Sequence, residues 1–279
     1  MSAPAAESPQ IISVTTVLSL LSTVAILASA YLTSLRLLPT SSSLQLRILF
    51  IWHAFDALIH FILEGSYLWN CFFSHIPSTT EVSHYLPPNV YFLGQKGYLF
   101  GAEYGTSPLS ALWREYAKAD KRWGGSDLGV ISLELLTVFV AGPMAVWICH
   151  CLKKERADGC FWMIVLATGE LYGGRSCVPV GQWQKLVLIE CFPGFMTFAP
   201  EWLSGSPNLN TSNFMYTYVF RACFQRPVWL TRNSWVYLFF FNTIWVWIPL
   251  WILYACYGQI TRSISRDQAG SNGGKRKAK

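Results

Sequence analysis

Apolar runs long enough to cross a lipid bilayer constrain this fold more than any other sequence feature. Five are found, near residues 11–35, 48–73, 128–152, 160–174 and 235–258. A helix needs about 20 predominantly apolar residues to span the hydrocarbon core. The fourth run falls short, because Glu170 interrupts it and Arg175 ends it. The sequence therefore predicts an all-α, polytopic membrane protein, built as a bundle of five transmembrane helices.

The composition agrees with a membrane protein. Hydrophobic residues make up 52% of the 279 and charged residues only 13%, whereas soluble domains carry about 25% charged residues. The net charge of +6 does not indicate a nucleic-acid partner, because the basic residues stand at the ends of the apolar runs and in the tail. The eight cysteines contain no CxxC pair, so neither a metal site nor a disulfide framework is expected.

Basic residues near the short loops predict the orientation of the chain. They are Arg36 and Arg47, then Lys153, Lys154 and Arg156, then Arg262 and Arg266. Such residues favour the cytosolic side, so the C-terminus is expected in the cytosol, and the N-terminus and the regions 74–127 and 175–234 on the opposite side. No basic segment precedes the first run, which we interpret as a retained helix rather than a signal peptide.

Two short motifs bear on location. Asn210-Thr211-Ser212 is either a glycan acceptor or a chance tripeptide. Residues 263–279 are polar and are predicted to form a disordered basic tail. Its last residues, KRKAK, place Lys275 and Lys277 as in a dilysine retrieval signal, which favours the endoplasmic reticulum membrane. The alternative is a tail that only touches anionic lipid.

Four ionisable residues interrupt the second run. At about 100° per residue, His53, Asp56, His60 and Glu64 share one helix face. A charged side chain at mid-bilayer costs at least about 2.5–3.5 kcal/mol and marks a functional site by default. This polar stripe is therefore predicted to face protein or water. A His–Glu pair that only joins two helices is the alternative, and His53 is expected to be an interfacial residue.

Other runs supply candidate partners for the stripe. Glu134 and Thr137 lie three apart on one face of the third run, ahead of Gly142-Pro143, which should loosen or kink the helix. In the last run, Asn242 and Trp245 are also three apart. An amide in hydrocarbon is costly unless it forms a hydrogen bond across helices.

Five motifs resemble, in order, the emopamil-binding protein family, the five-helix sterol Δ8–Δ7 isomerases that share the EXPERA domain. They are HFILEG, LWREYAKADKRW, ELLT with GP behind it, ELYGG and FFNTIWVWIP, spread over about residues 45–260. The resemblance implies three parts: an N-terminal segment 1–44 with the first transmembrane helix, an EXPERA-like domain 45–262 with four transmembrane helices and an intramembrane ligand cavity, and the tail 263–279. It implies a sterol or another lipophilic molecule as the partner and no cofactor. It leaves homo-oligomerisation open.

The resemblance also assigns residues. His60 and Glu64 become members of an acid/base set, Glu134 the carboxylate that faces them, and Thr137 its hydroxyl neighbour. Tyr172, Asn242 and Trp245 become substrate contacts. Asp56 matches nothing in the family pattern, so its role as a substrate-binding residue depends on the polar stripe alone.

The chemistry explains why such residues would act together. Moving a ring double bond requires protonating one alkene carbon, tolerating a carbocation, and removing a proton from the neighbouring carbon. A carboxylic acid removed from water can keep its proton and act as the donor, while a histidine or a second carboxylate accepts the departing proton. The π face of Trp245 could stabilise the cation, an interaction worth about 2 kcal/mol when desolvated.

Two departures from the family pattern leave the function open. ELYGG replaces the usual Gln-Ile-Tyr-Gly-Asp, which adds Glu170 and puts Gly174 where an Asp is usual. Residues 175–194 resemble an insertion that splits the fourth helix, and 222–233 a second one. We hypothesise a retained intron or a misassigned splice site, with a genuine excursion outside the membrane as the alternative. Besides a sterol isomerase, the sequence allows an isomerase or cyclase of another lipophilic substrate such as a terpenoid, or a non-catalytic sterol-binding protein.

Overall fold

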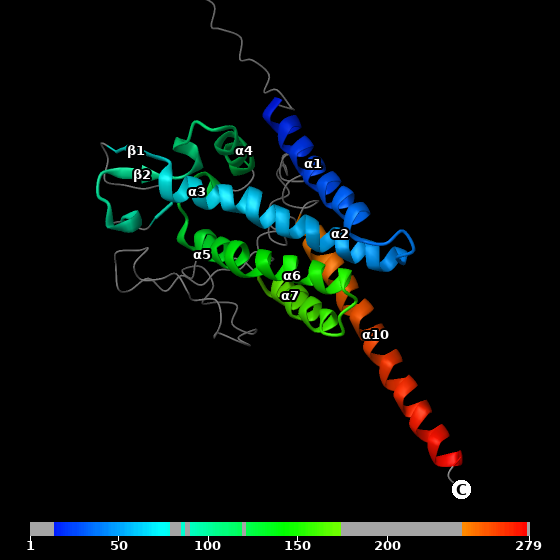
Figure 1. Cartoon of the computed structure of the whole chain (residues 1–279). Coiled ribbons are helices and arrows are strands. Elements are labelled where there is room, and N and C mark those ends of the chain that lie inside the picture. The colour runs from blue at the N-terminus through cyan, green and yellow to red at the C-terminus, as the bar shows by residue number, and fades with distance from the viewer. Residues whose placement is uncertain (1–13, 79–84, 87–89, 119–120, 174–241, 278–279) are drawn as a thin grey trace, which may run out of the picture.

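The computed structural model describes residues 14–78, 85–86, 90–118, 121–173 and 242–277. The transmembrane region contains α1 (Val14–Leu37), α2 (Leu44–Leu58), η1 (Ile59–Glu64), α3 (Gly65–Phe73), α5 (Leu128–Leu136), η5 (Thr137–Ala141), α6 (Gly142–Lys153), α7 (Gly159–Gly173) and α10 (Asn242–Lys277). Between α3 and α5 lie β1 (His75–Pro77), η2 (Phe92–Gly94), β2 (Tyr98–Phe100), η3 (Ala102–Tyr104), α4 (Pro108–Ala117) and η4 (Lys121–Gly124). Figure 1 shows long helices side by side, with the strands and α4 at one end.

Four helices within these ranges are long and apolar enough to cross a membrane. They are α1, the continuous helix Leu44–Phe73, the continuous helix Leu128–Lys153, and Ile244–Gln268 of α10. α7 has 15 residues, about 22 Å at 1.5 Å per residue, which is less than a hydrocarbon core of about 30 Å. The protein is therefore helical and multi-pass, with four spans and one shorter apolar helix among the described residues, and the five-helix bundle stays a prediction.

The helices pack around one apolar core. Neighbours contact one another in the order α1, α2, α6, α7 and α10. Phe50, Ile148, Met163 and Ile252 belong to the buried cluster between them. Large apolar side chains also point outward on every span, which is expected of helices that face lipid. The predicted intramembrane ligand cavity stays a prediction.

The connection between the second and third spans has its own core and docks on α3. β1 and β2 pair antiparallel, and α4 begins at the side-chain cap of Ser107 with Pro108 in its first turn. Trp113 of α4 stacks on Trp123 at 5.0 Å, and both rings contact Tyr67 of α3. The Trp113 Nε1–H donates to Ser66 Oγ at 2.9 Å. This region therefore closes one end of the second span.

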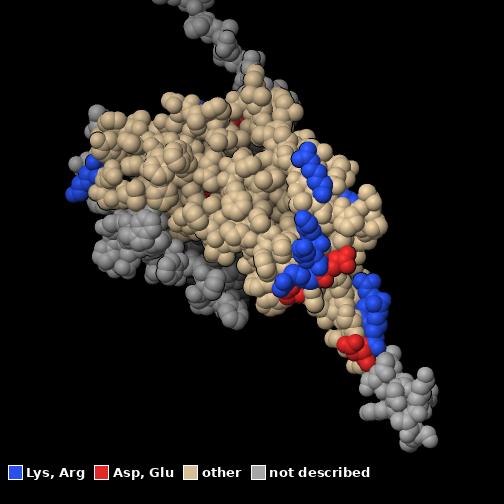
Figure 2. Space-filling model, viewed as in Figure 1, with Lys and Arg blue, Asp and Glu red and all other residues tan. Residues whose placement is uncertain are grey.

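α10 continues through Lys277, which differs from the disordered tail predicted over 263–279. Extending an existing helix fixes one residue for each added hydrogen bond. The polar residues that follow the apolar span can therefore continue its helix. In Figure 2, most of the visible Lys and Arg side chains lie toward the end of the molecule from which α10 projects. The stretches 175–194 and 222–233 and the tripeptide Asn210-Thr211-Ser212 lie outside the described residues.

Candidate active site

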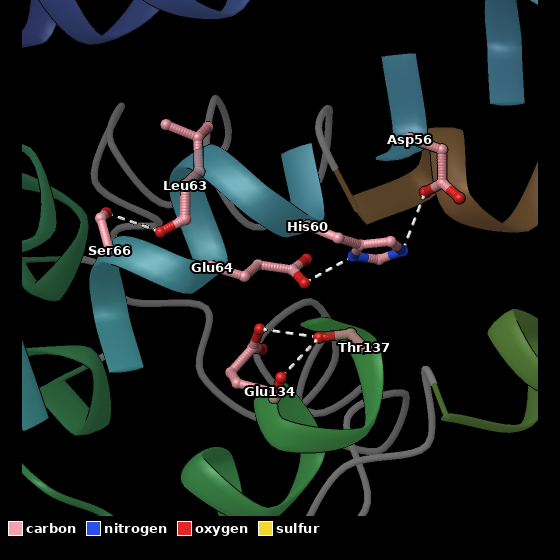
Figure 3. A network of polar contacts seen from close by, with 7 residues as sticks. All are labelled: Asp56, His60, Leu63, Glu64, Ser66, Glu134 and Thr137. Atoms are coloured by element: carbon pink, nitrogen blue, oxygen red, sulfur yellow. Dashed lines mark hydrogen bonds and ion pairs between the residues drawn. The ribbon is translucent and has the colours of Figure 1, made fainter. Parts of the chain in front are cut away.

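His60 lies between two carboxyl groups in the middle of the second span. Its Nδ1 is 2.5 Å from Glu64 Oε2, and its Nε2 is 3.2 Å from Asp56 Oδ1. The exposed fraction is 3% for His60 and 0% for Asp56. Figure 3 shows the ring placed between the two side chains. The stripe predicted from sequence is therefore a connected set of groups, and Asp56, which matches nothing in the family pattern, is part of it.

A π-helical turn aligns these three residues. At about 100° per residue, the two i→i+4 steps from Asp56 to Glu64 would accumulate an offset of about 80° in a regular α-helix. η1 is a π-helix, and the Gly65 N–H after it donates to the His60 carbonyl, five residues back. The wider turn reduces the offset, so both carboxyl groups can reach the same ring. Single π turns of this kind occur often at functional sites.

Glu134 approaches from the third span, where a second π turn begins. Its exposed fraction is 3%. The Thr137 hydroxyl donates to Glu134 Oε2 and to its backbone carbonyl, both at 3.1 Å. η5 ends where the Gly142 N–H donates to the Thr137 carbonyl, directly before Pro143, which has no N–H to continue a regular ladder. The helix loosening predicted at Gly142-Pro143 is therefore a π turn that ends directly before Gly142.

The two π turns pack against each other. A Cβ atom added at Gly142 would lie 2.9 Å from the Phe61 ring and 3.3 Å from His60 Cβ. A side chain at this position would therefore push η1 and η5 apart. The approach brings the Glu134 carboxyl into direct electrostatic contact with that of Glu64, and Figure 3 shows the two side chains on facing helices.

The arrangement can both donate and accept a proton. Glu64 is paired with His60, whereas Glu134 beside it accepts a hydrogen bond from the hydroxyl of Thr137. Two carboxyl groups in such contact are most stable with one proton between them. The described residues contain no group of three metal-ligating side chains.

Other predicted residues lie elsewhere. The Trp245 ring packs 5.5 Å from that of Trp52 and 6.0 Å from that of Phe55, ahead of His60 on the second span. The side chains of Tyr172 and Asn242 lie outside the described part of the chain. Their roles as substrate contacts stay predictions. His53 was expected at the interface, but it is fully buried, and neither ring nitrogen has a hydrogen-bond partner among the described residues.

Glu170 is the site residue that sequence reasoning missed. Its carboxyl oxygens are buried, and the group interacts electrostatically with Asp56. The signal was present, since an acid stands in an apolar run. It was interpreted only as a departure from the family pattern, because α7 is too short to show which face it turns inward.

A family model described as EXPERA (EXPanded EBP superfamily) matches residues 108–179 and 185–256, more than half of the chain. The match includes Glu134, Glu170 and Trp245 but begins after His60 and Glu64. Its interruption at 180–184 falls inside the stretch 175–194 that the sequence analysis singled out.

Several named proteins are similar to the chain. A probable 3-beta-hydroxysteroid-Delta(8),Delta(7)-isomerase of Arabidopsis thaliana is 22% identical over 214 residues, which cover 77% of this chain and 66% of the relative. The 3-beta-hydroxysteroid-Delta(8),Delta(7)-isomerase of Cavia porcellus is 23% identical over 198 residues, or 71% and 58%. Isomeliandiol synthase of Melia azedarach is 22% identical over 214 residues, or 77% and 70%. The chain spans less than two thirds of the length of the first two relatives.

Proposed function

Because the chain belongs to the EXPERA (EXPanded EBP) superfamily, we propose that it is a sterol Δ8–Δ7 isomerase that works within a membrane. The observation that carries the proposal is the approach of the buried carboxyl of Glu134 to that of Glu64, which is 16% exposed and paired with a histidine. The first two relatives described above, named as isomerases of this class, support the choice of substrate.

In the proposed reaction, the Glu134 carboxyl donates its proton to one carbon of the ring double bond. The alkene π electrons form the new C–H bond, which leaves a carbocation on the adjacent carbon. Glu64, paired with His60, removes a proton from the next carbon, and the electrons of that C–H bond form the shifted double bond. A proton then returns from Glu64 to Glu134, and the cycle closes without a net gain or loss of protons.

The experiment is to express the chain in cells blocked at the Δ8–Δ7 step and to profile their sterols by mass spectrometry. The wild-type chain should restore Δ7 sterols. Glu64→Gln and Glu134→Gln should each lower conversion by about 10²–10⁴-fold, the usual contribution of a general acid or base, while expression stays normal. Unchanged conversion in either variant would refute the assignment.

Two controls sharpen this test. Glu155→Gln removes an exposed carboxyl from the loop between α6 and α7, and it should convert sterol like the wild type. A chain without 175–194 tests whether that stretch is tolerated. Rescue by the shortened chain alone would support the splicing hypothesis.

Isomerisation of another lipophilic substrate is the second candidate. The additional acids Asp56 and Glu170 favour it, because they change the polarity of the site, and one relative is named isomeliandiol synthase. Failure of the wild-type chain to restore sterols, with loss of a terpenoid product in Glu64→Gln, would support this candidate. A non-catalytic sterol-binding protein would instead keep its ligand when both Glu64 and Glu134 are replaced.

We place the protein in the endoplasmic reticulum membrane with its C-terminus in the cytosol. Lys275 and Lys277 in the terminal KRKAK, and the basic residues at the α1–α2 and α6–α7 connections, support this location.

A further inference from the structure

Two of the four carboxyl groups around His60 have no part in the proposed reaction. Glu64 and Glu134 lie on the Nδ1 side of the ring, and Asp56 lies on the Nε2 side, 3.2 Å away. Glu170 of α7 is the neighbour of Asp56. The ring therefore separates two pairs of carboxyl groups, and only one pair has been given a role.

α2 and α7 both pack on α6, and Glu170 of α7 interacts with Asp56 of α2. Leu166 and Ala167, one turn before Glu170, are buried in the same apolar cluster as Phe55 and Ala57, which flank Asp56. All four carboxylate oxygens of Asp56 and Glu170 are buried, and the partners that Asp56 has here are His60, at 3.2 Å, and Glu170. Two ionised carboxylates in such a place would repel each other without compensation by water, whereas a pair that shares one proton would not.

A proton can pass between Asp56 and the Glu64–Glu134 pair through His60. The titratable groups that face Asp56 are His53 and His60 on its own helix, Glu170 on α7, and Cys149 on α6. Of these groups, His60 is the one that forms an ion pair with Glu64. An imidazole can accept a proton at one nitrogen while it releases another from the second nitrogen.

We propose that Asp56 and Glu170 form a second carboxyl pair that stores a proton and exchanges it with the Glu64–Glu134 pair through His60. In the forward direction, Glu64 gives its proton to Nδ1, and the N–H bond at Nε2 breaks as Asp56 accepts that proton. The ring changes tautomer, and the reverse transfer restores it. The proton that comes back through His60 to Glu64 passes on to Glu134, so the second pair holds the proton between turnovers and the cycle closes as before.

An infrared measurement tests the second pair without any substrate. Purified protein carrying both Glu64→Gln and Glu134→Gln should keep a carbonyl band of protonated carboxyl groups that shifts in heavy water. Adding Asp56→Asn or Glu170→Gln should remove the band, whereas adding Glu155→Gln should not. Absence of the band from the double variant, or its persistence after both further changes, would overturn the proposal.

A kinetic measurement tests the exchange and depends on the proposed function. With a 3β-hydroxy-Δ8 sterol in detergent micelles, Asp56→Asn should complete its first turnover at nearly the wild-type rate and then turn over at least about tenfold more slowly. Asp56→Glu, which retains a carboxyl group, should restore the later turnovers, and Glu170→Gln should resemble Asp56→Asn.

Equal slowing of the first and later turnovers would mean that Asp56 only orients His60, and would refute proton storage. A wild-type protein that converts no sterol would refute the proposed function instead. The infrared result would then still decide whether the second pair exists.

Discussion

The hydroxyl of Thr137 distinguishes the two reacting carboxyl groups at the scale of single residues. It donates to Glu134 Oε2 at 3.1 Å, whereas Glu64 is joined to a histidine. The hydroxyl orients the Glu134 carboxyl toward η1. The proton donor and the proton acceptor of the proposed reaction are therefore both carboxyl groups, and their hydrogen-bond partners distinguish them.

Thr137→Val tests this role. The variant preserves the side-chain shape but removes the hydrogen bond, and bonds to ionisable groups contribute about 1.5–3 kcal/mol. We expect sterol conversion to fall about 10- to 100-fold, measured in the blocked cells. Thr33→Val is the control, because the Thr33 hydroxyl is exposed and donates to the Ser29 carbonyl of its own helix. Equal conversion by both variants would exclude a role for Thr137.

At the scale of elements, the site depends on how closely two π turns approach. Gly142→Ala should move His60 by a few tenths of an ångström, because the added Cβ would lie 3.3 Å from His60 Cβ. Since a misplacement of about 1 Å can cost about 100-fold in rate, we expect a three- to tenfold loss of sterol conversion.

Gly169→Ala is the matched control for Gly142→Ala. It makes the same change within a helix, but no described residue lies within 4 Å of the added Cβ. Both variants gain helix propensity, about 1 kcal/mol each. A loss of conversion in both would therefore point to the backbone and not to the contact between η1 and η5.

The docking of α4 on α3 should contribute to stability. Trp113 is 6% exposed, stacks on Trp123 and donates to Ser66, so Trp113→Ala should lower the free energy of unfolding by about 3–5 kcal/mol. Trp69→Ala, on the same side of the bundle but 64% exposed, should have little effect. Thermal unfolding in detergent, followed by tryptophan fluorescence, compares the two variants. Similar losses would show that α4 is not anchored by Trp113.

At the scale of the whole molecule, the sequence predicted the membrane class, four of the spans and the polar stripe. Apolar length and 100° spacing are local properties, and they located His60, Glu64 and Glu134 before any contact was known. The π turns were not predicted, because hydrophobic periodicity does not register one wider turn. Glu170 was missed because its role depends on how α7 is placed beside the second span, which is a tertiary property. The helical extension of α10 was missed because composition alone reports only polarity.

The distribution of charge across the whole molecule makes a prediction about its orientation. The basic connections α1–α2 and α6–α7 and the end of α10 should share the cytosolic side, because positively charged loops are retained there. The hairpin β1–β2 then lies on the opposite side, at the other end of the second span. An epitope tag at the C-terminus should bind antibody after the plasma membrane alone is permeabilised. A tag inserted between Gln95 and Lys96, in the connection between η2 and β2, should bind only after all membranes are opened. Antibody binding in the reverse order would show that the topology is inverted. The span that contains Asp56, His60 and Glu64 would then enter the membrane from the other side.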